Sequence, residues 1–548
     1  MACTKLFSGD LPELTNEIIK YFWNDFSTLH SCILVNRLWC RLAITLLWEN
    51  PFLKNNPKNY HFIEIYLNRL NDDDKKKLDE YGINNELFPS NTTFNYPSFI
   101  KCLNTQKVSS SIKTWVEIKT KFSNFNQYFK LPSFIFLSLI RIFIDNEVNL
   151  HTLEVEVSYT LENITNDCFK SVLQLMLRNP KFTGKIKNLA INFNRLASNL
   201  LSYLKRFNPI CNSILSLYIH SSMDDYAEKD LSRIISLQQN LEKIYFNRKI
   251  YPLKSLKNSN CSNTLKVIIF YDIYFENLGV NFNEAFEQLN VLESIHILNC
   301  YPINTMFVQQ IINLTKPFKL KSLFMDKRSV PHIDSLKLLL QKSGDYLEYV
   351  GFESSIDYEL KLHLFKLFQI YCIKIKFLSL LGFDDKISFP ALDLVKEFQH
   401  NLNYLIINFS QFGYDQISYD DKLSSIILHN LGQILPDRLE YLSMALKFNI
   451  NDLEVFFKNS QNVFIRKLLI RNKFYQENEN VLPCIKEYVM KEKRVSYLAM
   501  ENLPVTNNER RDLYYLKDEV KEFKLYDIQV KKYNYLCIQV SDFINESY

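Results

Sequence analysis

A short arrangement of apolar and polar residues recurs through most of the chain. In a six-residue frame the first, fourth and sixth residues are apolar, as in LESIHI, LKSLFM and LEYLSM. The frames begin at Leu150, Ile186, Ile214, Leu241, Leu265, Leu292, Leu320, Leu347, Ile375, Leu402, Leu439, Ile465 and Val495. Twelve intervals therefore span 345 residues and average about 29, a period that indicates a repeat architecture.

Each repeat is expected to contain one strand and one helix. The alternating apolar positions at the end of the frame predict a short strand. Helix-period runs follow some frames, at residues 282–289, 332–343 and 359–368. A weaker frame at Val520 and the alternating Leu536, Ile538 and Val540 are expected to close the carboxyl-terminal end. A bundle of helical repeats is the competing interpretation, but the β-branched and aromatic residues favour strands.

The frame resembles the leucine-rich repeat. The resemblance implies an α/β solenoid in which each unit buries its apolar edge against its neighbours. We expect a horseshoe with parallel strands inside and helices outside, over residues 148–548, including a carboxyl-terminal cap.

The amino-terminal module, Leu11–Phe52, shows a different, helical period. Pro12 suits the first turn of a helix, in which Leu14, Ile18 and Phe22 share a face. Ser27 is expected to cap a second helix, with an apolar stripe of Leu34, Val35, Leu38, Trp39 and Leu42. A third piece contains Leu46, Leu47 and Trp48 and ends at Asn50 and Pro51. About forty residues cannot bury this many large apolar groups alone, so the pattern predicts a docking module.

The order and spacing of several residues in this module resemble the F-box. They are Leu11-Pro12, Glu17-Ile18, Leu34-Val35-Asn36-Arg37, Trp39 and Leu47-Trp48. The resemblance implies contact with a Skp adaptor, and through it with a cullin and a RING subunit of a ubiquitin ligase. The implied adaptor-binding residues are Leu11, Pro12, Ile18, Leu34, Val35, Trp39, Leu47 and Trp48. Many F-boxes carry Cys where this chain has Asn36. The alternative is that these helices only cap the solenoid, with Trp39 and Trp48 as core residues.

The predicted domains are a tail at 1–8, the F-box at 9–52, a helical linker at 53–147 and the solenoid at 148–548. Two helix-like runs in the linker, Tyr60–Leu70 and Ile112–Phe122, are separated by a turn-rich stretch and by NDDDKKK, Asn71–Lys77. We interpret NDDDKKK as a short solvated face of mixed charge. The amino-terminal third resembles an expanded family of fungal F-box proteins.

One outward position of the frames changes character along the chain. Two residues after each frame start, the earlier repeats carry mostly small polar residues, and the later ones carry Tyr349, Phe377, Tyr404, Tyr441, Lys467 and Tyr497. Tyrosine is favoured in interface hot spots, so Tyr349, Phe377, Tyr404, Tyr441 and Tyr497 form a hypothetical substrate-binding lane. The alternative is that these rings stack as cross-strand ladders that support the sheet.

Composition narrows the possible partners. The 65 basic and 60 acidic residues leave a net charge of +5 over 548 residues, too dilute for a nucleic-acid-binding surface. The sequence has no apolar run of about twenty residues and no signal-peptide pattern, so we expect no membrane partner and a cytoplasmic or nuclear location. Eleven scattered cysteines without C-x-x-C spacing predict reduced thiols rather than metal ligands or disulfides.

Motifs for catalysis are missing from the sequence. None of the nine glycines lies in a G-x-G-x-x-G or P-loop arrangement, and isolated histidines such as His296 are expected to be structural. We expect no enzyme, no cofactor and no metal. The expected function is a substrate-recognition adaptor that binds a Skp adaptor and an unknown protein target, promoting ubiquitination and proteasomal degradation. A repeat scaffold without a ubiquitin-ligase role, or a hydrolase with scattered catalytic residues, are the alternatives.

Overall fold

The structure is a computed structural model in which the chain forms two compact units, Met1–Leu265 (unit 1) and Lys266–Tyr548 (unit 2). The described residues are 11–23, 25–53, 60–89, 92–120, 125–157, 166–193, 213–221, 232–248, 256–257, 259–275, 282–326, 328–329, 332–353, 356–382, 387–408, 421–446, 448–475, 481–504 and 511–548.

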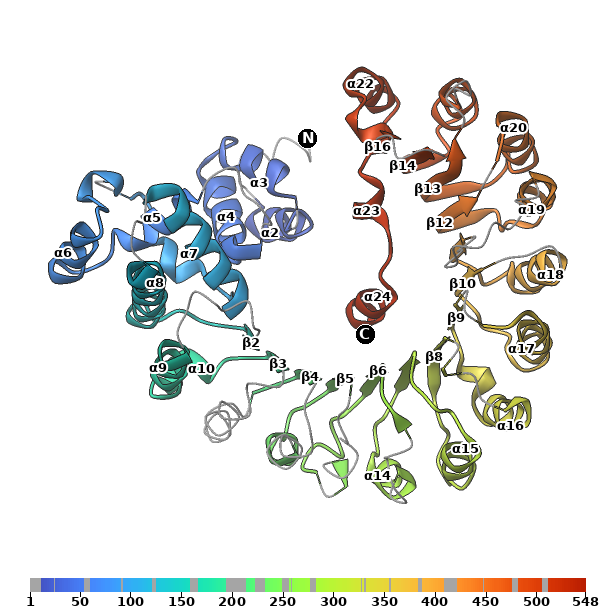
Figure 1. Ribbon diagram of the computed structural model, residues 1–548, viewed down its shortest axis with the longest axis horizontal. Helices are drawn as coiled ribbons and strands as arrows, with labels where there is room; N and C mark the ends of the chain where they lie inside the picture. The colour runs from blue at the N-terminus through green and yellow to red at the C-terminus, as the bar shows by residue number, and fades with distance from the viewer. Residues whose placement is uncertain are drawn as a thin grey trace. The chain divides into compact units, whose positions relative to one another are not determined.

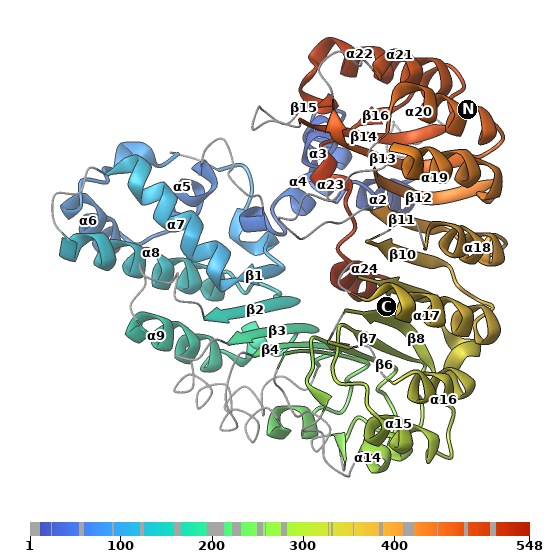
Figure 2. The same ribbon diagram turned by 45° about the vertical axis from the view of Figure 1, so that its right-hand side comes forward.

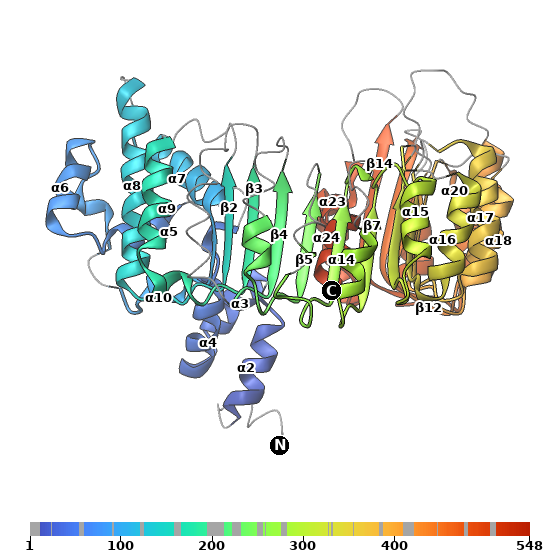
Figure 3. The same cartoon turned by 90° about the horizontal axis from the view of Figure 1, so that it is seen from below.

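Unit 1 begins with helices and continues with parallel strands. Its helices are α2 (Pro12–Lys20), α3 (Phe26–Ile33), α4 (Arg37–Leu47), α5 (His61–Leu67), α6 (Asp72–Glu80), α7 (Thr105–Lys119), α8 (Phe125–Asp145), α9 (Asn166–Leu177) and α10 (Pro180–Thr183). Its strands are β1 (Cys102–Asn104), β2 (Thr152–Val157), β3 (Asn188–Phe193), β4 (Ser216–Ser221) and β5 (Lys243–Asn247). Consecutive strands pair in parallel, and Figure 3 shows β2, β3 and β4 side by side.

The linker differs from the prediction in two places. Strand β1 lies within it and pairs with β2, so the sheet of unit 1 begins before Leu150. The buried side chains of Leu103 and Leu153 are register partners in this pair. NDDDKKK is not a break between helices but most of α6, because Asn71 caps the helix and three aspartates complement the positive end of its dipole.

Unit 2 alternates parallel strands with helices. The strands are β6 (Val267–Tyr271), β7 (Ser294–Leu298), β8 (Leu320–Met325), β9 (Tyr349–Phe352), β10 (Phe377–Leu381), β11 (Tyr404–Asn408), β12 (Arg438–Leu446), β13 (Phe464–Tyr475) and β14 (Val495–Pro504). The helices are α14 (Phe282–Gln288), α15 (Thr305–Ile312), α16 (Ile333–Ser343), α17 (Tyr358–Tyr371), α18 (Ser388–Phe398), α19 (Asp421–Ile434), α20 (Ile450–Asn459) and α21 (Leu482–Ile485). Figure 1 shows α14 to α20 on the outer side of these strands.

The burial pattern explains why the six-residue frame recurs. In the frame that begins at Leu347, the first, fourth and sixth side chains, Leu347, Val350 and Phe352, are buried. The two apolar positions in the strand face the helices, and the residue between them lies on the other face. Each of the thirteen frames from Leu150 to Val495 coincides with a strand, and the three predicted helical runs coincide with α14, α16 and α17. The fold is therefore a leucine-rich-repeat solenoid, as predicted, and not a bundle of helical repeats.

The carboxyl-terminal end of unit 2 differs from the prediction. The segment at Val520 is helix α22 (Lys517–Leu525), not a strand, because acidic residues in its first turn and Lys524 in its last complement the helix dipole. Short strands β15 (Arg511–Asp512) and β16 (Gln529–Val530) pair with β14. The expected alternation from Leu536 to Val540 is not a strand. It joins helix α23 (Tyr533–Leu536) to helix α24 (Val540–Ser547).

Candidate functional site

The amino-terminal module has three helices, but their limits differ from those predicted. Helix α3 is capped by Asp25, whose carboxylate accepts a hydrogen bond from Thr28 N at 3.1 Å, and not by Ser27. Helix α4 is capped by Asn36, whose side-chain oxygen accepts from Trp39 N at 2.9 Å. The predicted second helix is thus two helices, and Leu34 and Val35 lie in the turn between them. The predicted third piece is the end of α4.

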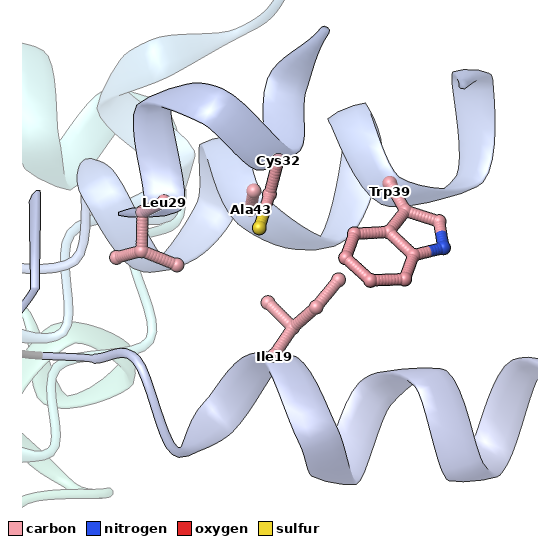
Figure 4. Packing of buried hydrophobic residues seen from close by; sticks show 5 residues of the cluster. All are labelled: Ile19, Leu29, Cys32, Trp39 and Ala43. Atoms are coloured by element: carbon pink, nitrogen blue, oxygen red, sulfur yellow. The ribbon is translucent and has the colours of Figure 1, made fainter. Parts of the chain in front are cut away.

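The core of the module is small and contains residues from all three helices. Figure 4 shows Ile19, Leu29, Cys32, Trp39 and Ala43 packed together. On α2 the buried residues are Thr15 and Ile19 rather than the predicted face. The predicted face, Leu14, Ile18 and Phe22, is exposed or half-buried.

Several large apolar side chains of the module remain exposed to solvent. The exposed fraction is 78% for Leu34, 45% for Val35 and 52% for Leu14. Leu11, Tyr21 and Trp23 are also exposed. We call this set, Leu11, Leu14, Tyr21, Trp23, Leu34 and Val35, the exposed apolar residues of the module. Large apolar groups left in water at this density indicate a surface for a partner.

The eight predicted adaptor-binding residues divide into three groups by burial. Leu11, Pro12, Leu34 and Val35 are exposed, Ile18, Leu47 and Trp48 are half-buried, and Trp39 is buried. Trp39 therefore belongs to the hydrophobic core of the module, below the exposed residues.

Trp48 joins the module to the helices that follow it. The Trp48 ring lies 4.2 Å from the Tyr96 ring and 5.5 Å from the Tyr66 ring, between centroids. The backbone N–H groups of Lys101 and Cys102 donate to Glu49 O at 3.0 and 3.2 Å. The end of α4 is thus tied by hydrogen bonds to the first strand of unit 1.

A second candidate surface is the row of aromatic side chains along unit 2. Tyr349, Phe377, Tyr404 and Tyr441 are register partners on consecutive strands β9 to β12, and we call them the aromatic row. Their ring centroids are 6.2, 5.8 and 6.4 Å apart in that order. Tyr497, two strands further on, is separated from the row by Lys467. The row is therefore a cross-strand ladder of aromatic rings, the alternative that the sequence left open.

The aromatic row is covered by another segment of the same chain. Phe543 of α24 lies 5.9 Å from Tyr349, 5.2 Å from Phe377 and 5.0 Å from Tyr404, between ring centroids. Tyr548 lies 6.1 Å from Tyr349. Figures 1 and 2 show α23 and α24 on the face of the strands away from the outer helices. The sequence reasoning missed Phe543 and Tyr548, although Val540, Phe543 and Ile544 have the spacing of an apolar helix face.

The segment before α24 is anchored by polar contacts. The Ile538 N–H donates to the Tyr441 hydroxyl at 3.3 Å, and burial raises the pKa of that hydroxyl. The buried Tyr533 has its hydroxyl 3.4 Å from that of Ser443. The Arg471 guanidinium lies 3.9 Å from the centroid of the Tyr533 ring. These contacts fix residues 533–538, here called the anchored segment, on strands β12 and β13.

A cavity of about 360 Å³ lies between the sheet of unit 2 and residues 537–541. The lining on the sheet side includes the small residues Ser379 and Ser443, whereas the Phe324 ring fills the space next to Gly351. Asn408 Oδ1 and Arg471 Nε, both of residues that line the cavity, are buried and have no hydrogen-bond partner within the described part of the chain. The volume is within the range of small-ligand pockets.

His296 and the described cysteines have the following surroundings. His296 is buried, with Nδ1 2.7 Å from the Ser322 hydroxyl. Burial raises the pKa of the Cys102 thiol to about 11, which keeps it protonated at neutral pH. The described cysteines are free, and these residues contain no group of three or more His, Cys, Asp and Glu able to hold a metal. Across the ranges that the structure describes, no helix is both long and apolar enough to cross a membrane.

Comparisons with known proteins add little to this picture. No protein-family model matches the chain, and no curated protein matches its sequence. The crystal structure of the Rad7 and Elc1 complex in yeast is similar over 72% of this chain and 87% of that chain. The sequence identity is 14% and the TM-score is 0.35. A similarity at this TM-score carries no argument, so the fold assignment depends on the strand order and the burial pattern described above.

Proposed function

We propose that the chain is a substrate-recognition adaptor of a ubiquitin ligase. Its amino-terminal module is an F-box that binds a Skp adaptor, and its repeats bind a target protein. The chain itself is no enzyme and needs no cofactor; it acts in the cytoplasm or nucleus by holding the target close to a ubiquitin-charged enzyme.

The observation that carries the proposal is the exposed turn at Leu34 and Val35. A leucine with an exposed fraction of 78% is not needed for the core of the module, which is formed by other residues. Burying such a side chain in a partner contributes roughly 2 kcal/mol. Two adjacent residues of this kind support a docking contact, and both belong to the F-box resemblance.

The geometry of the turn is fixed from both sides. Helix α3 ends at Ile33, and the Leu34 and Val35 N–H groups donate to Ser31 O and Cys32 O at 3.1 and 3.2 Å. Asn36 stands at a position where many F-boxes have Cys, and in this chain it caps α4. A preorganised turn loses little conformational entropy on binding.

The experiment is a binding measurement between the purified chain and a Skp adaptor. The double variant Leu34→Asp/Val35→Asp should bind at least about 100-fold more weakly, because it places two charges in a contact that buries apolar groups. Its thermal unfolding should match that of the wild type, since both side chains are exposed. Ile118→Asp on α7 is the matched control, with an exposed fraction of 63%, and should bind normally.

Undiminished binding by the double variant would overturn the proposed contact. Trp39→Ala is a poor test, because Trp39 is part of the module core and its loss would unfold the surface. A reconstituted ubiquitination reaction then separates the ligase role from a scaffold role: a chain that binds the adaptor but never supports ubiquitin transfer to a bound target is a scaffold.

A further inference from the structure

We propose that the aromatic row is a docking groove for a short amphipathic helix bearing a phenylalanine, and that α24 occupies this groove when no partner is bound. In the assembled ligase that helix belongs to the target protein, and this part of the inference rests on the proposed function. The groove and its occupant are properties of unit 2 alone.

The occupant defines which partner the groove fits. The Phe543 ring lies within 6 Å of three rings of the row, and the next side chain, Ile544, is fully buried. Asp542 and Glu546, on the same helix, are exposed. A fitting helix therefore has an aromatic residue followed by an aliphatic one on its inner face and polar residues on its outer face.

Helix α24 is held differently from the anchored segment. Residues 533–538 have hydrogen bonds and a cation–π contact with β12 and β13. Helix α24 meets β9, β10 and β11 through the ring contacts of Phe543, its Ile544 is buried, and it is only eight residues long. The residue that follows it, Tyr548, packs on Tyr349 and on His296 of β7, with ring centroids 6.1 and 4.4 Å apart. Isolated helices of this length are unstable in water, so α24 loses its structure once those contacts break.

The cavity lies where the anchored segment meets α24. Residues 537–541 line it, and Gln539 at its edge is exposed. Residues beside a space of this size have fewer packing contacts than residues of a close-packed core. The tail is thus held at Tyr533, at Ile538 and at Phe543, and residues 539–541 between the last two border the cavity. This arrangement allows α24 to leave while the anchored segment stays in place.

Because α24 is tethered beside the groove, a partner helix must compete with a high effective concentration of α24. A short flexible tether gives an effective concentration of about 1 mM at the groove. A partner helix with the affinity of α24 itself therefore binds the intact chain weakly. It binds strongly when α24 is absent, or when other contacts of the target add to its affinity.

The test uses a fluorescent peptide with the sequence of residues 539–548, QVSDFINESY, as the probe. Its binding is measured by fluorescence anisotropy to the intact chain and to a chain that ends at Gln539. We expect the shortened chain to bind the peptide at least tenfold more tightly than the intact chain does. A peptide with Phe543→Ser should bind neither.

Two further variants keep the test decisive. Tyr404→Ser in the shortened chain should weaken peptide binding at least tenfold, whereas Ile370→Ser, at an exposed position on α17, should not change it. If shortening lowers the unfolding temperature, the full-length chain with Phe543→Ser replaces the shortened chain, because that variant keeps the anchored segment and changes only one residue after it. It should bind the wild-type peptide at least tenfold more tightly than the intact chain.

Equal peptide binding by the intact and the opened chains would overturn the displacement. Failure of a folded, opened chain to bind the peptide would overturn the groove itself. Neither result concerns the Skp adaptor, which is absent from the assay, so the proposed function and this inference can fail independently.

Discussion

The amino-terminal module and the aromatic row of unit 2 both have large apolar side chains that are not needed for the hydrophobic core. The two regions differ in how far these side chains are exposed to solvent. In the module, Leu34 and Val35 are left in water. On unit 2, Phe377 is fully buried because Phe543 and its own strand neighbours cover it. One set of side chains is exposed to solvent, and the other is covered by a segment of the same chain.

The difference teaches that exposure alone does not identify a binding surface. The exposed apolar residues of the module are found by asking which large side chains remain in water. The aromatic row would be missed by that question. The aromatic row is identified because its buried contacts are made by α24, a short helix that is not stable on its own.

The largest expected effect separates core from surface within the module. Leu29→Ala should lower the free energy of unfolding by about 3 kcal/mol, since it leaves a cavity in the small core of the module. Leu34→Ala should change it by less than about 0.5 kcal/mol. Urea unfolding followed by tryptophan fluorescence measures both. Similar losses in the two variants would show that Leu34 belongs to the core and that the contrast between the regions is false.

The next largest effect concerns the ring contacts that stabilise α24 on the aromatic row. Phe543→Ala should increase hydrogen exchange in residues 540–547 about tenfold, corresponding to a loss of about 1.4 kcal/mol, because the ring contacts with Phe377 and Tyr404 are removed. Exchange in α17 is the internal reference and should stay the same. Unchanged exchange in α24 would mean that other contacts hold this helix.

A smaller effect is expected in the anchored segment. Tyr441→Phe removes the hydroxyl that accepts a hydrogen bond from Ile538 N, at a cost of about 1 kcal/mol. Hydrogen exchange should accelerate at Ile538 and less in α24. If α24 accelerates as much as Ile538, the two parts of the tail open together, and the division between them is wrong.

The smallest effect depends on pH. Burial, and then the nearby Asp326, raise the pKa of Glu353, which lines the cavity. The folded chain therefore prefers protonated Glu353, so the ionised form costs stability above the folded pKa, and this cost disappears as the pH falls. Glu353→Gln should stabilise unit 2 by less than about 1 kcal/mol at pH 7 and not at all below about pH 4, where the unfolded carboxyl is also protonated.

Unfolding temperatures measured between pH 7 and pH 4 would show this convergence. The Gln side chain keeps an oxygen that can accept the hydrogen bond from Asn299 Nδ2, 3.2 Å away in the wild type. A variant that is less stable than the wild type at pH 7 would contradict the assignment of an unfavourable charge at this position.

The repeats could be predicted from sequence because their determinants are local. The three apolar positions of each frame are buried against adjacent repeats about 29 residues away, so the same spacing recurs wherever a strand is needed. Strand β1 lacks a full frame. It is three residues long, and its partner β2 is about fifty residues further along the chain, so only the folded structure shows the pairing.

The limits of the module helices were predictable in part. Asn36 is a good N-cap, and it stands three residues before Trp39, whose N–H it accepts. The apolar run on both sides of it led instead to the prediction of one continuous helix. The cover over the aromatic row could not be predicted, because Phe543 reaches Phe377 from 166 positions later in the chain. No local pattern encodes such a contact.

The pairing of β15 and β16 with β14 affects how copies of this chain meet one another. Along its final strand, the sheet of unit 2 is hydrogen-bonded at Glu501 and Asn502 by β15 and at Tyr497 and Leu498 by β16. A strand whose outer backbone groups are already engaged is a poor template for edge-to-edge polymerisation. Because both short strands precede Gln539, a chain cut at that residue retains this protection, and we expect it to remain free of fibres at the concentrations that binding assays require.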